Sequence, residues 1–309
     1  MNSPIWFLAT GDGHVAALLE VARGLGGPVV AVVVADDLVA ELLAAAGVDR
    51  VLHLQPGDGV PAEAVAAHVG RLAAAEAPRV VLAGSGPADR VLLAAAAVAL
   101  GAPVLTGVST VSIVDASVVV ERTTLGGIVA ERAEFAGPVA VLLDGGGIPT
   151  PMLARAPVQV QVVTPEPVAG LTVLGTETVT VAPVELGAAP RVVGIGRGLR
   201  AREDLSLVEA LAEAAGAELA CSRPLAEEHD WLAKERYIGI SGQHVAPDLY
   251  VAIGISGQLQ HMAGVRGAPT IVAINSDENA PIFAEADYGI VGDLYTVVPA
   301  LTAALAGSV

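Results

Sequence analysis

The feature that most constrains this fold is a regular alternation of short Val- and Ile-rich segments with longer Ala- and Leu-rich segments. The short segments are typical of strands buried on both faces, and the longer ones are typical of helices. In the first half the expected strands are 5–9, 29–35, 50–54 and 79–83, and the expected helices are 14–25, 38–46, 61–75 and 89–100. Strands that alternate with helices form a parallel sheet with helices on both faces, so the sequence predicts an α/β fold.

The alternation breaks in the middle of the chain. Short strands are expected at 117–123, 128–134 and 139–143, and their turn-rich connections favour antiparallel hairpins that complete the first sheet. Residues 164–190 are rich in proline and show little periodicity, which is typical of a connection between domains. We therefore expect a Rossmann-like domain over 1–186 and a second α/β domain over 187–309, each a mainly parallel sheet flanked by helices.

The second domain is expected to repeat the order of strand and helix. Its expected strands begin at Arg191 and continue at 217–221, 249–253, 270–274 and 288–291. The expected helices cover 203–215, begin at Ser256, cover 280–284, and run from the N-cap Asp293 to about residue 306.

Charge and composition exclude several classes of function. The chain has 33 acidic and 16 basic residues, a net charge of −17, which disfavours binding to nucleic acid or to anionic membranes. Residues 91–114 are uncharged, but Gly101 and Pro103 favour a helix, a turn and a strand over a membrane span. Cys221 is the one cysteine and the histidines lack metal-ligand spacing, so we expect no disulfide, no metal site and a cytoplasmic protein.

The segment Gly254–Ile255–Ser256–Gly257 follows a predicted strand and precedes a predicted helix. At such a turn, free N–H groups and the positive end of the helix dipole point to one place, which suits an anion such as a pyrophosphate. Gly254 and Gly257 would let the backbone approach this anion, and Ser256 would add a hydroxyl donor. A tight turn with a serine N-cap explains the same spacing equally well, so the spacing leaves both interpretations open.

Other polar residues follow predicted strands at the edge of the sheet where α/β proteins bind ligands. Arg197 lies in a glycine turn and suits a phosphate, and Ser222–Arg223 follows the next strand. His261 is the histidine best placed to donate a hydrogen bond to a ligand carbonyl. Asn275 and Asp293 suit ribose or adenine, although a turn asparagine and an ordinary N-cap explain them as well.

The hexapeptide Ile-Gly-Ile-Ser-Gly-Gln occurs twice, at 238–243 and at 253–258. Chance is one explanation in a chain this rich in glycine and isoleucine. The alternative is that two loops, each with glycine amides and a serine hydroxyl, meet the same extended ligand.

Several segments of the second domain closely resemble the α subunit of electron transfer flavoproteins. They are Val-Ala-Pro-Asp-Leu-Tyr at 245–250, Gly-Ile-Ser-Gly-Gln-Leu-Gln-His-Met-Ala-Gly at 254–264, Thr-Ile-Val-Ala-Ile-Asn at 270–275, Ala-Pro-Ile-Phe at 280–283 and Ala-Asp-Tyr-Gly-Ile-Val-Gly-Asp-Leu at 286–294. The resemblance is dense over residues 191–301. Over residues 1–190 it is weaker and depends mainly on the order of the elements.

This resemblance implies a heterodimer, with a β subunit contacted by the first domain and an extended FAD held mainly by the second. The residues that it assigns to the flavin side are Arg197, Ser222, Arg223, Ile238, Gly239, Ile240 and Ser241, with Ser241 near flavin N5. Those assigned to the pyrophosphate and ring are Ser256, Gly257, Gln258, Leu259, Gln260 and His261, with His261 facing the pyrimidine carbonyl. Those assigned to the adenosine end are Asn275, Asp293 and Leu294.

The first copy of the hexapeptide departs from that family. The family usually has Gln-x-Gly-Gln-Thr-Gly-Lys where this chain has Tyr-Ile-Gly-Ile-Ser-Gly-Gln at 237–243. Ser241 keeps the hydroxyl of threonine, but Ile240 lacks an amide donor and Gln243 lacks a cation. The electron chemistry of this site is therefore expected to be tuned differently.

The resemblance implies an electron carrier rather than an enzyme that converts an organic substrate. The carrier would accept electrons from a flavin dehydrogenase, such as an acyl-CoA dehydrogenase of fatty acid β-oxidation, and pass them to a quinone reductase or similar acceptor. A variant is an electron-bifurcating flavoprotein with NADH as donor and a second FAD in place of AMP on the β subunit. An alternative from another class is an NAD(P)-dependent oxidoreductase that uses the glycine turns for its cofactor.

Overall fold

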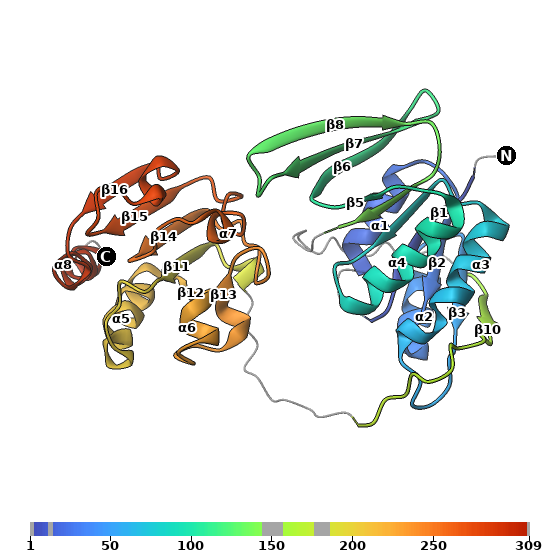
Figure 1. Cartoon of the computed structure of the whole chain (residues 1–309), viewed down its shortest axis with the longest axis horizontal. Coiled ribbons are helices and arrows are strands. Elements are labelled where there is room, and N and C mark those ends of the chain that lie inside the picture. Colours follow the sequence, from blue (N-terminus) through green and yellow to red (C-terminus); the bar gives the residue numbers. More distant parts are fainter. Residues whose placement is uncertain (1–2, 12–14, 144–156, 176–185, 308–309) are drawn as a thin grey trace. The chain divides into compact units, whose positions relative to one another are not determined.

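The computed structural model describes residues 3–11, 15–143, 157–175 and 186–307 (Figure 1). The chain divides into two compact units, Met1–Val179 and Thr180–Val309. Both units are α/β, with mainly parallel sheets flanked by helices, as the sequence predicts.

The first unit contains a seven-stranded parallel sheet with the strand order β10-β3-β2-β1-β4-β9-β5. The strands are β1 (Ile5–Ala9), β2 (Val29–Val33), β3 (Arg50–Leu54), β4 (Val80–Ala83), β5 (Val104–Leu105), β9 (Val139–Leu142) and β10 (Val160–Val163). The helices are α1 (Val15–Gly24), α2 (Asp37–Ala45), α3 (Ala66–Glu76) after the 3-10 turn η1 (Ala62–Val65), and α4 (Pro87–Leu100). The four strands and four helices predicted in the first half are therefore confirmed, with shifts at their ends.

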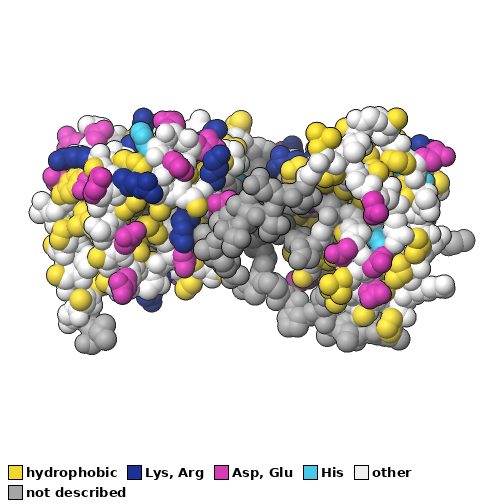
Figure 2. All heavy atoms as spheres, turned by 90° about the horizontal axis from the view of Figure 1, so that it is seen from below, with side chains coloured by type: hydrophobic (Ala, Val, Ile, Leu, Met, Phe, Trp, Pro, Cys, Tyr) yellow, Lys and Arg dark blue, Asp and Glu magenta, His cyan; other side chains and the backbone are white. Residues whose placement is uncertain are grey.

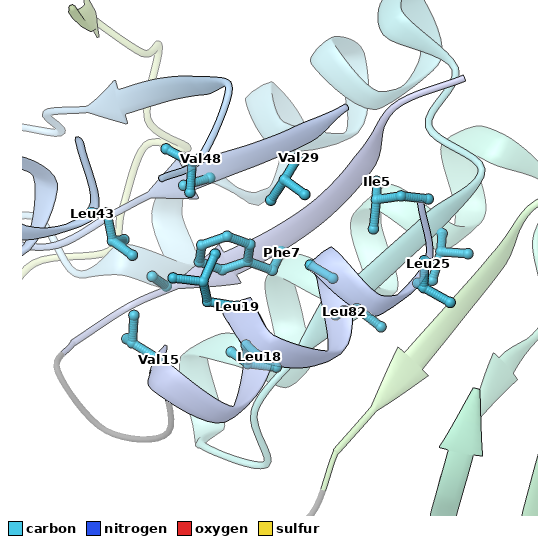
Figure 3. Close-up of a cluster of buried hydrophobic side chains, with 14 of the residues drawn as sticks. Ile5, Phe7, Val15, Leu18, Leu19, Leu25, Val29, Leu43, Val48 and Leu82 are labelled. Carbon is cyan, nitrogen blue, oxygen red and sulfur yellow. The ribbon is translucent and has the colours of Figure 1, made fainter. Parts of the chain in front are cut away.

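Different helices cover the two faces of this sheet. Side chains alternate between the faces along a strand. Ile5 and Phe7 of β1 therefore pack with α1 and α2, whereas Trp6 and Leu8 pack with α3 and α4. Figure 3 shows the first cluster, in which Phe7 and the side chains of α1 belong to one buried group.

The strands expected at 117–123, 128–134 and 139–143 are present, and the first two form the expected antiparallel hairpin, but the prediction that they complete the parallel sheet as hairpins is wrong. A separate antiparallel sheet is formed by β6 (Val108–Val114), β7 (Ser117–Thr124) and β8 (Val129–Phe135). The next strand, β9, returns to the parallel sheet between β4 and β5. The cause is burial, because β9 is an apolar run buried along its whole length, which is typical of a central parallel strand.

Much of the predicted connection at 164–190 belongs to the units themselves. The backbone N–H groups of Val168 and Val173 donate to the carbonyls of Ala64 and Gly59 in the first unit. Leu186 is buried in the core of the second unit. The units divide between residues 179 and 180, compared with the expected division between 186 and 187, and residues 176–185 lie outside the described part of the chain.

The second unit contains a six-stranded parallel sheet with the order β13-β12-β11-β14-β15-β16. The strands are β11 (Arg191–Ile195), β12 (Glu218–Ser222), β13 (Tyr237–Ile238), β14 (Leu249–Ile253), β15 (Ile271–Asn275) and β16 (Tyr288–Val291). The chain winds outward in one direction from β11 to β13 and then in the other from β14 to β16. Doubly wound sheets bind ligands where this direction reverses, at the carboxyl ends of the strands.

The helices of this unit differ from the prediction at several points. They are α5 (Leu205–Ala215), α6 (Arg223–Glu227), α7 (Leu259–Met262) and α8 (Leu294–Ala306), with 3-10 turns η2 (Leu186–Ala188), η3 (Arg202–Asp204), η4 (Lys234–Arg236) and η5 (Pro281–Ala284). The α8 helix begins as predicted, because the Asp293 side chain accepts a hydrogen bond from the backbone N–H of Tyr295.

The helix expected to begin at Ser256 begins later and is short. Gly257 has a φ of +79°, and the backbone turns helical only after Gln258. The carbonyl of Ser256 accepts a hydrogen bond from the backbone N–H of Ile282 in η5. The Gly254–Gly257 turn is therefore held to a neighbouring turn instead of opening a helix, and Ser256 is not a helix N-cap.

Charged side chains of both signs are visible on the face of the units drawn in Figure 2. Figure 2 shows acidic side chains scattered over the visible faces of both units, with basic side chains among them rather than in one patch. No helix among the described residues is long and apolar enough to cross a membrane.

Candidate functional site

A cavity of about 770 Å³ lies at the carboxyl ends of the strands of the second unit, where the strand order reverses. Its volume falls within the range of roughly 300 to 1,000 Å³ that is typical of small-molecule and cofactor sites. The lining residues lie at or after the ends of all six strands and comprise Gly196, Arg197, Gly198, Arg200, Ser222, Arg223, Pro224, Tyr237, Ile238, Gly239, Ile240, Ser241, Gly254, Ile255, Ser256, Gln258, Gln260, His261, Ile274, Asn275, Ser276, Asp293 and Leu294.

The two central turns of the cavity pack glycine against glycine. The N–H of Gly198, after β11, donates to the carbonyl of Gly254, after β14, over 3.0 Å. Gly254 has a φ of +60°, and a Cβ atom there would lie 2.8 Å from the Cα of Gly198. A side chain at this position would therefore force the two turns apart.

Both copies of the repeated hexapeptide border this one cavity. The first copy follows the edge strand β13, and the second follows the central strand β14. The first copy is held near the second, because the N–H of Ile240 donates over 2.8 Å to the carbonyl of Gln260, two residues beyond the second copy. The arrangement favours the interpretation that two similar loops meet one ligand over chance repetition.

The charge at the cavity opposes the charge of the whole chain. Three arginines line it, Arg197, Arg200 and Arg223, against a single carboxylate, that of Asp293. In a chain with 33 acidic and 16 basic residues, this makes the cavity a local concentration of positive charge. Such a cavity favours an anionic ligand.

The three arginines differ in the protein groups that already pair with their guanidinium groups. The guanidinium of Arg223 donates from Nε to Glu227 in the next turn of α6, at 2.5 Å. Arg200 stacks 4.8 Å from the ring centroid of Tyr295 and lies 3.8 Å from the carboxylate of Asp293. None of the ion pairs among the described residues involves Arg197, which is exposed, so its charge is the most available to a ligand.

Asn275 lines the cavity but also braces its wall. Its amide nitrogen donates to the carbonyl of Ile255 over 2.8 Å, and its amide oxygen accepts from the backbone N–H of Asp277 over 3.0 Å. Asn275 therefore acts as the turn residue that its position allows, and it holds the turn that carries Ser256.

His261 is buried under the cavity rather than exposed at its mouth. Its side chain is 7% exposed, and its Nε2 lies 2.7 Å from the hydroxyl oxygen of Tyr250. Burial lowers the pKa of His261 to about 4, and the nearby Ile238 backbone opposes this shift in part. The ring is therefore neutral near pH 7, and Nδ1 is buried without a hydrogen-bond partner of normal geometry among the described residues.

The low pKa of His261 predicts acid sensitivity. As the pH falls from 6.5 towards 4, the unfolded chain binds a proton at this histidine and the folded chain does not. Stability is therefore fully present above pH 6.5 and decreases towards pH 4, by on the order of 3 kcal/mol. Urea unfolding at several pH values measures this slope.

Two glutamine variants test that expectation. His261→Gln is expected to flatten the slope between pH 4 and 6.5, because it removes the group that takes up the proton. His244→Gln, at an exposed histidine of the same unit, is expected to leave the slope unchanged. Equal slopes in the wild type and His261→Gln would contradict a buried, neutral His261.

Cys221 is fully buried beside this region. Burial raises the pKa of its thiol to about 12, so the thiol stays protonated at neutral pH. Among the described residues there is no group of three or more His, Cys, Asp or Glu side chains that would hold a metal ion.

The structure brings most of the sequence-predicted site residues together. Gly257 and Leu259 do not line the cavity, and a Cβ at Gly257 would overlap the backbone of Ile282, so that glycine serves packing. The lining residues that sequence reasoning missed include Arg200, Pro224 and Ser276. Arg200 and Ser276 adjoin the predicted turns at Arg197 and Asn275, and this adjacency is the sequence signal that could have identified them as lining residues.

Comparison with known proteins agrees with this geometry. Residues 12–168 match the family described as the electron transfer flavoprotein domain, and residues 185–266 match the electron transfer flavoprotein FAD-binding domain. A solved structure from Mycobacterium smegmatis, described as a thiamin diphosphate-dependent enzyme, covers 98% of this chain and 59% of its own. Its TM-score is 0.24 at 14% identity, and a similarity this low supports no conclusion about the fold or the function of this chain.

Curated relatives extend the match along the chain. Protein FixB of Escherichia coli O6:K15:H31 (strain 536 / UPEC) and of Salmonella typhi are each 45% identical over 210 residues, which is 67% of either chain. YdiR of Escherichia coli (strain K12), named as an electron transfer flavoprotein subunit, is 41% identical over 231 residues, 74% of either chain. The chain belongs to the electron transfer flavoprotein family, among its α subunits.

Proposed function

We propose that this chain is the α subunit of a heterodimeric electron transfer flavoprotein and binds FAD in the cavity of its second unit. With its β subunit it would carry electrons from flavin dehydrogenases, such as acyl-CoA dehydrogenases of β-oxidation, to a quinone reductase or similar acceptor. The observation that carries this proposal is the locally cationic cavity at the reversal point of a doubly wound sheet, lined by both glycine–serine loops.

The donor set of the cavity fits FAD. The pyrophosphate is an anion, and Arg197 and Arg200 offer it positive charge next to the glycine turns. The hydroxyl and amide groups that line the rest of the cavity can hydrogen-bond ribityl, ribose and ring atoms, and they comprise Ser222, Ser241, Ser256, Ser276, Gln258, Gln260 and Asn275. The apolar residues Ile238, Ile240 and Leu294 offer contact area to flat rings.

The protein residues would set the properties of the bound cofactor. FAD supplies reversible electron transfer when it is bound. Arg223 contributes positive charge, which favours the more negative, reduced form of a neighbouring flavin. Ile240 contributes neither a donor nor a charge and is 56% exposed at the cavity.

Co-purification with the β subunit tests this proposal. The chain co-expressed with an electron transfer flavoprotein β subunit is expected to yield a yellow complex with the visible spectrum of a flavin and FAD released on denaturation. Reduction of the complex by an acyl-CoA dehydrogenase and its substrate would support the proposed donor. A colourless complex that binds NAD(H) would instead support a nicotinamide-dependent oxidoreductase and would overturn the proposal.

Arg223 and Glu227 form a matched pair for measuring the charge at the flavin. Arg223→Ala is expected to lower the midpoint potential of bound FAD, because it removes positive charge that favours the reduced flavin. Glu227→Gln is expected to raise the potential, because Glu227 now neutralises the guanidinium. Redox titration of both complexes measures these shifts, and shifts of the same sign in both variants would contradict the placement of Arg223.

A further inference from the structure

The hydrogen bond between Tyr250 and His261 lies directly beneath the cavity. The Tyr250 hydroxyl oxygen and His261 Nε2 are 2.7 Å apart. Tyr250 is 0% exposed, in the second position of the central strand β14, and His261 lies on α7, which follows the second glycine–serine loop. Strand and cavity wall are thus joined by one buried side-chain bond.

The neighbouring strand is shaped to admit the tyrosine hydroxyl. A Cβ atom at Gly194 of β11 would overlap the Tyr250 hydroxyl oxygen. The absence of a side chain at Gly194 leaves the space that the Tyr250 hydroxyl occupies against the neighbouring strand β11. The position of Tyr250 is therefore determined by packing on both sides, and its hydroxyl cannot simply turn to another partner.

A count of donors and acceptors decides where the imidazole hydrogen lies. A neutral imidazole has one N–H and one lone pair, and a tyrosine hydroxyl donates once. Among the described residues His261 is the hydrogen-bond partner of the Tyr250 hydroxyl, and Nδ1 has none. If Nε2 carried the hydrogen, the buried tyrosine O–H would have no acceptor, which costs about 1–3 kcal/mol.

The other tautomer satisfies the pair. With the hydrogen on Nδ1, the Tyr250 O–H donates to Nε2, and the Nδ1–H is the one donor left over. The Ile238 backbone raises the pKa of His261, as a carbonyl near a ring N–H does, yet it does not complete a hydrogen bond of normal geometry. The remaining donor is a buried atom of a ring that lines the cavity, and among the described residues it has no acceptor of normal geometry.

We propose that Tyr250 is a positioning residue that holds His261 as the neutral Nδ1–H tautomer and so presents a fixed, uncharged hydrogen-bond donor to the cavity. The link to flavin rests on the proposed function, whereas the tautomer itself does not. The consequence is that the positive charge at this cavity comes from arginines alone. His261 would contribute an oriented hydrogen-bond donor but no charge.

Nuclear magnetic resonance of the ¹⁵N-histidine-labelled heterodimer tests the tautomer. The chain has six histidines, so His261 is assigned by the signal lost in His261→Gln. We expect the ¹⁵N shifts of the Nδ1–H tautomer in the wild type and a mixture or the Nε2–H tautomer in Tyr250→Phe. Tyr288→Phe, at an exposed tyrosine outside the cavity, is expected to resemble the wild type.

FAD affinity tests whether Tyr250 acts through His261. Tyr250→Phe is expected to weaken FAD binding by about threefold to tenfold, which is the range of one neutral hydrogen bond. In a His261→Gln background the same change is expected to add less than about twofold, because coupled residues do not act additively. A general packing defect would weaken binding equally in both backgrounds.

The outcomes separate this inference from the proposed function. A wild type with the hydrogen on Nε2, or equal effects of Tyr250→Phe in both backgrounds, would overturn the positioning role even if FAD is bound. A heterodimer without flavin would overturn the proposed function, and the tautomer spectrum would still decide the state of His261. If thermal melting shows that Tyr250→Phe is misfolded, the wild-type spectrum alone decides.

Discussion

Replacing Ser256 with tryptophan is expected to give a heterodimer that folds and assembles but contains no FAD. Ser256 lines the cavity at the turn between β14 and α7, and the carbonyl of this residue is held by the N–H of Ile282. The turn therefore cannot swing away to make room, and an indole there fills space that the cofactor needs. Visible absorbance at the flavin bands, relative to protein, measures the loss.

Two further variants separate bulk from the hydroxyl group. Ser256→Ala removes one hydrogen-bonding group and is expected to weaken FAD binding by about threefold to tenfold while keeping the complex yellow. Ala210→Trp adds the same bulk on an exposed position of α5, outside the cavity, and is expected to retain all of the FAD. Stoichiometric FAD in Ser256→Trp would show that the cavity is not the cofactor site.

The second large effect is expected from the core of the first unit. Leu93 of α4 is 1% exposed and packs on the sheet with Trp6 and Leu8. Leu93→Ala is expected to lower the free energy of unfolding of this unit by about 2–5 kcal/mol, because the deletion loses buried apolar contacts and leaves a cavity. Denaturant unfolding, followed by circular dichroism, measures the change.

The same helix offers the control. Val98 lies on α4 as well but is 84% exposed. Val98→Ala is expected to change the free energy of unfolding by less than about 0.5 kcal/mol, since it removes no buried contact and alanine favours helix. A similar loss in both variants would contradict the burial pattern of α4 and the sheet face that it covers.

Secondary structure was largely predictable because its signals are local. The strands at 5–9, 50–54 and 249–253 are buried apolar runs bounded by turn residues, and that pattern needs no knowledge of neighbours. The strand at 139–142 carries the same local pattern, but its partners were predicted wrongly. Its pairing with β4 and β5 depends on contacts distant in sequence.

The helix at Ser256 shows another limit of local reasoning. A strand, a glycine turn and a serine are equally consistent with a helix N-cap. The bond from the Ile282 N–H to the Ser256 carbonyl decides for an extended turn. That bond joins residues 26 positions apart in the chain, and no periodic pattern relates them, so the sequence does not predict it.

The sequence predicted which turns contribute to the candidate site, but it did not predict how these turns are arranged around the cavity. Arg197, Ser222, Ser256 and Asn275 each follow a predicted strand, and the carboxyl ends of parallel strands share one edge of a sheet. Arg200 and Pro224 were missed although they adjoin the predicted turns, because adjacency in sequence does not determine which way a turn bends. They line the cavity only because the turns after β11 and β12 curve towards it.

The alternation of apolar segments determined by itself that this chain forms two α/β domains, whereas the glycine–serine turns at 254–257 and 238–243 were compatible with a ligand site and with ordinary turns. Tertiary structure alone decided that both turns face one cavity, because the strand order places β13 and β14 in one sheet. It also decided the state of His261. Burial against Tyr250, which no sequence pattern reports, removes the charge of the imidazole and leaves a directed donor.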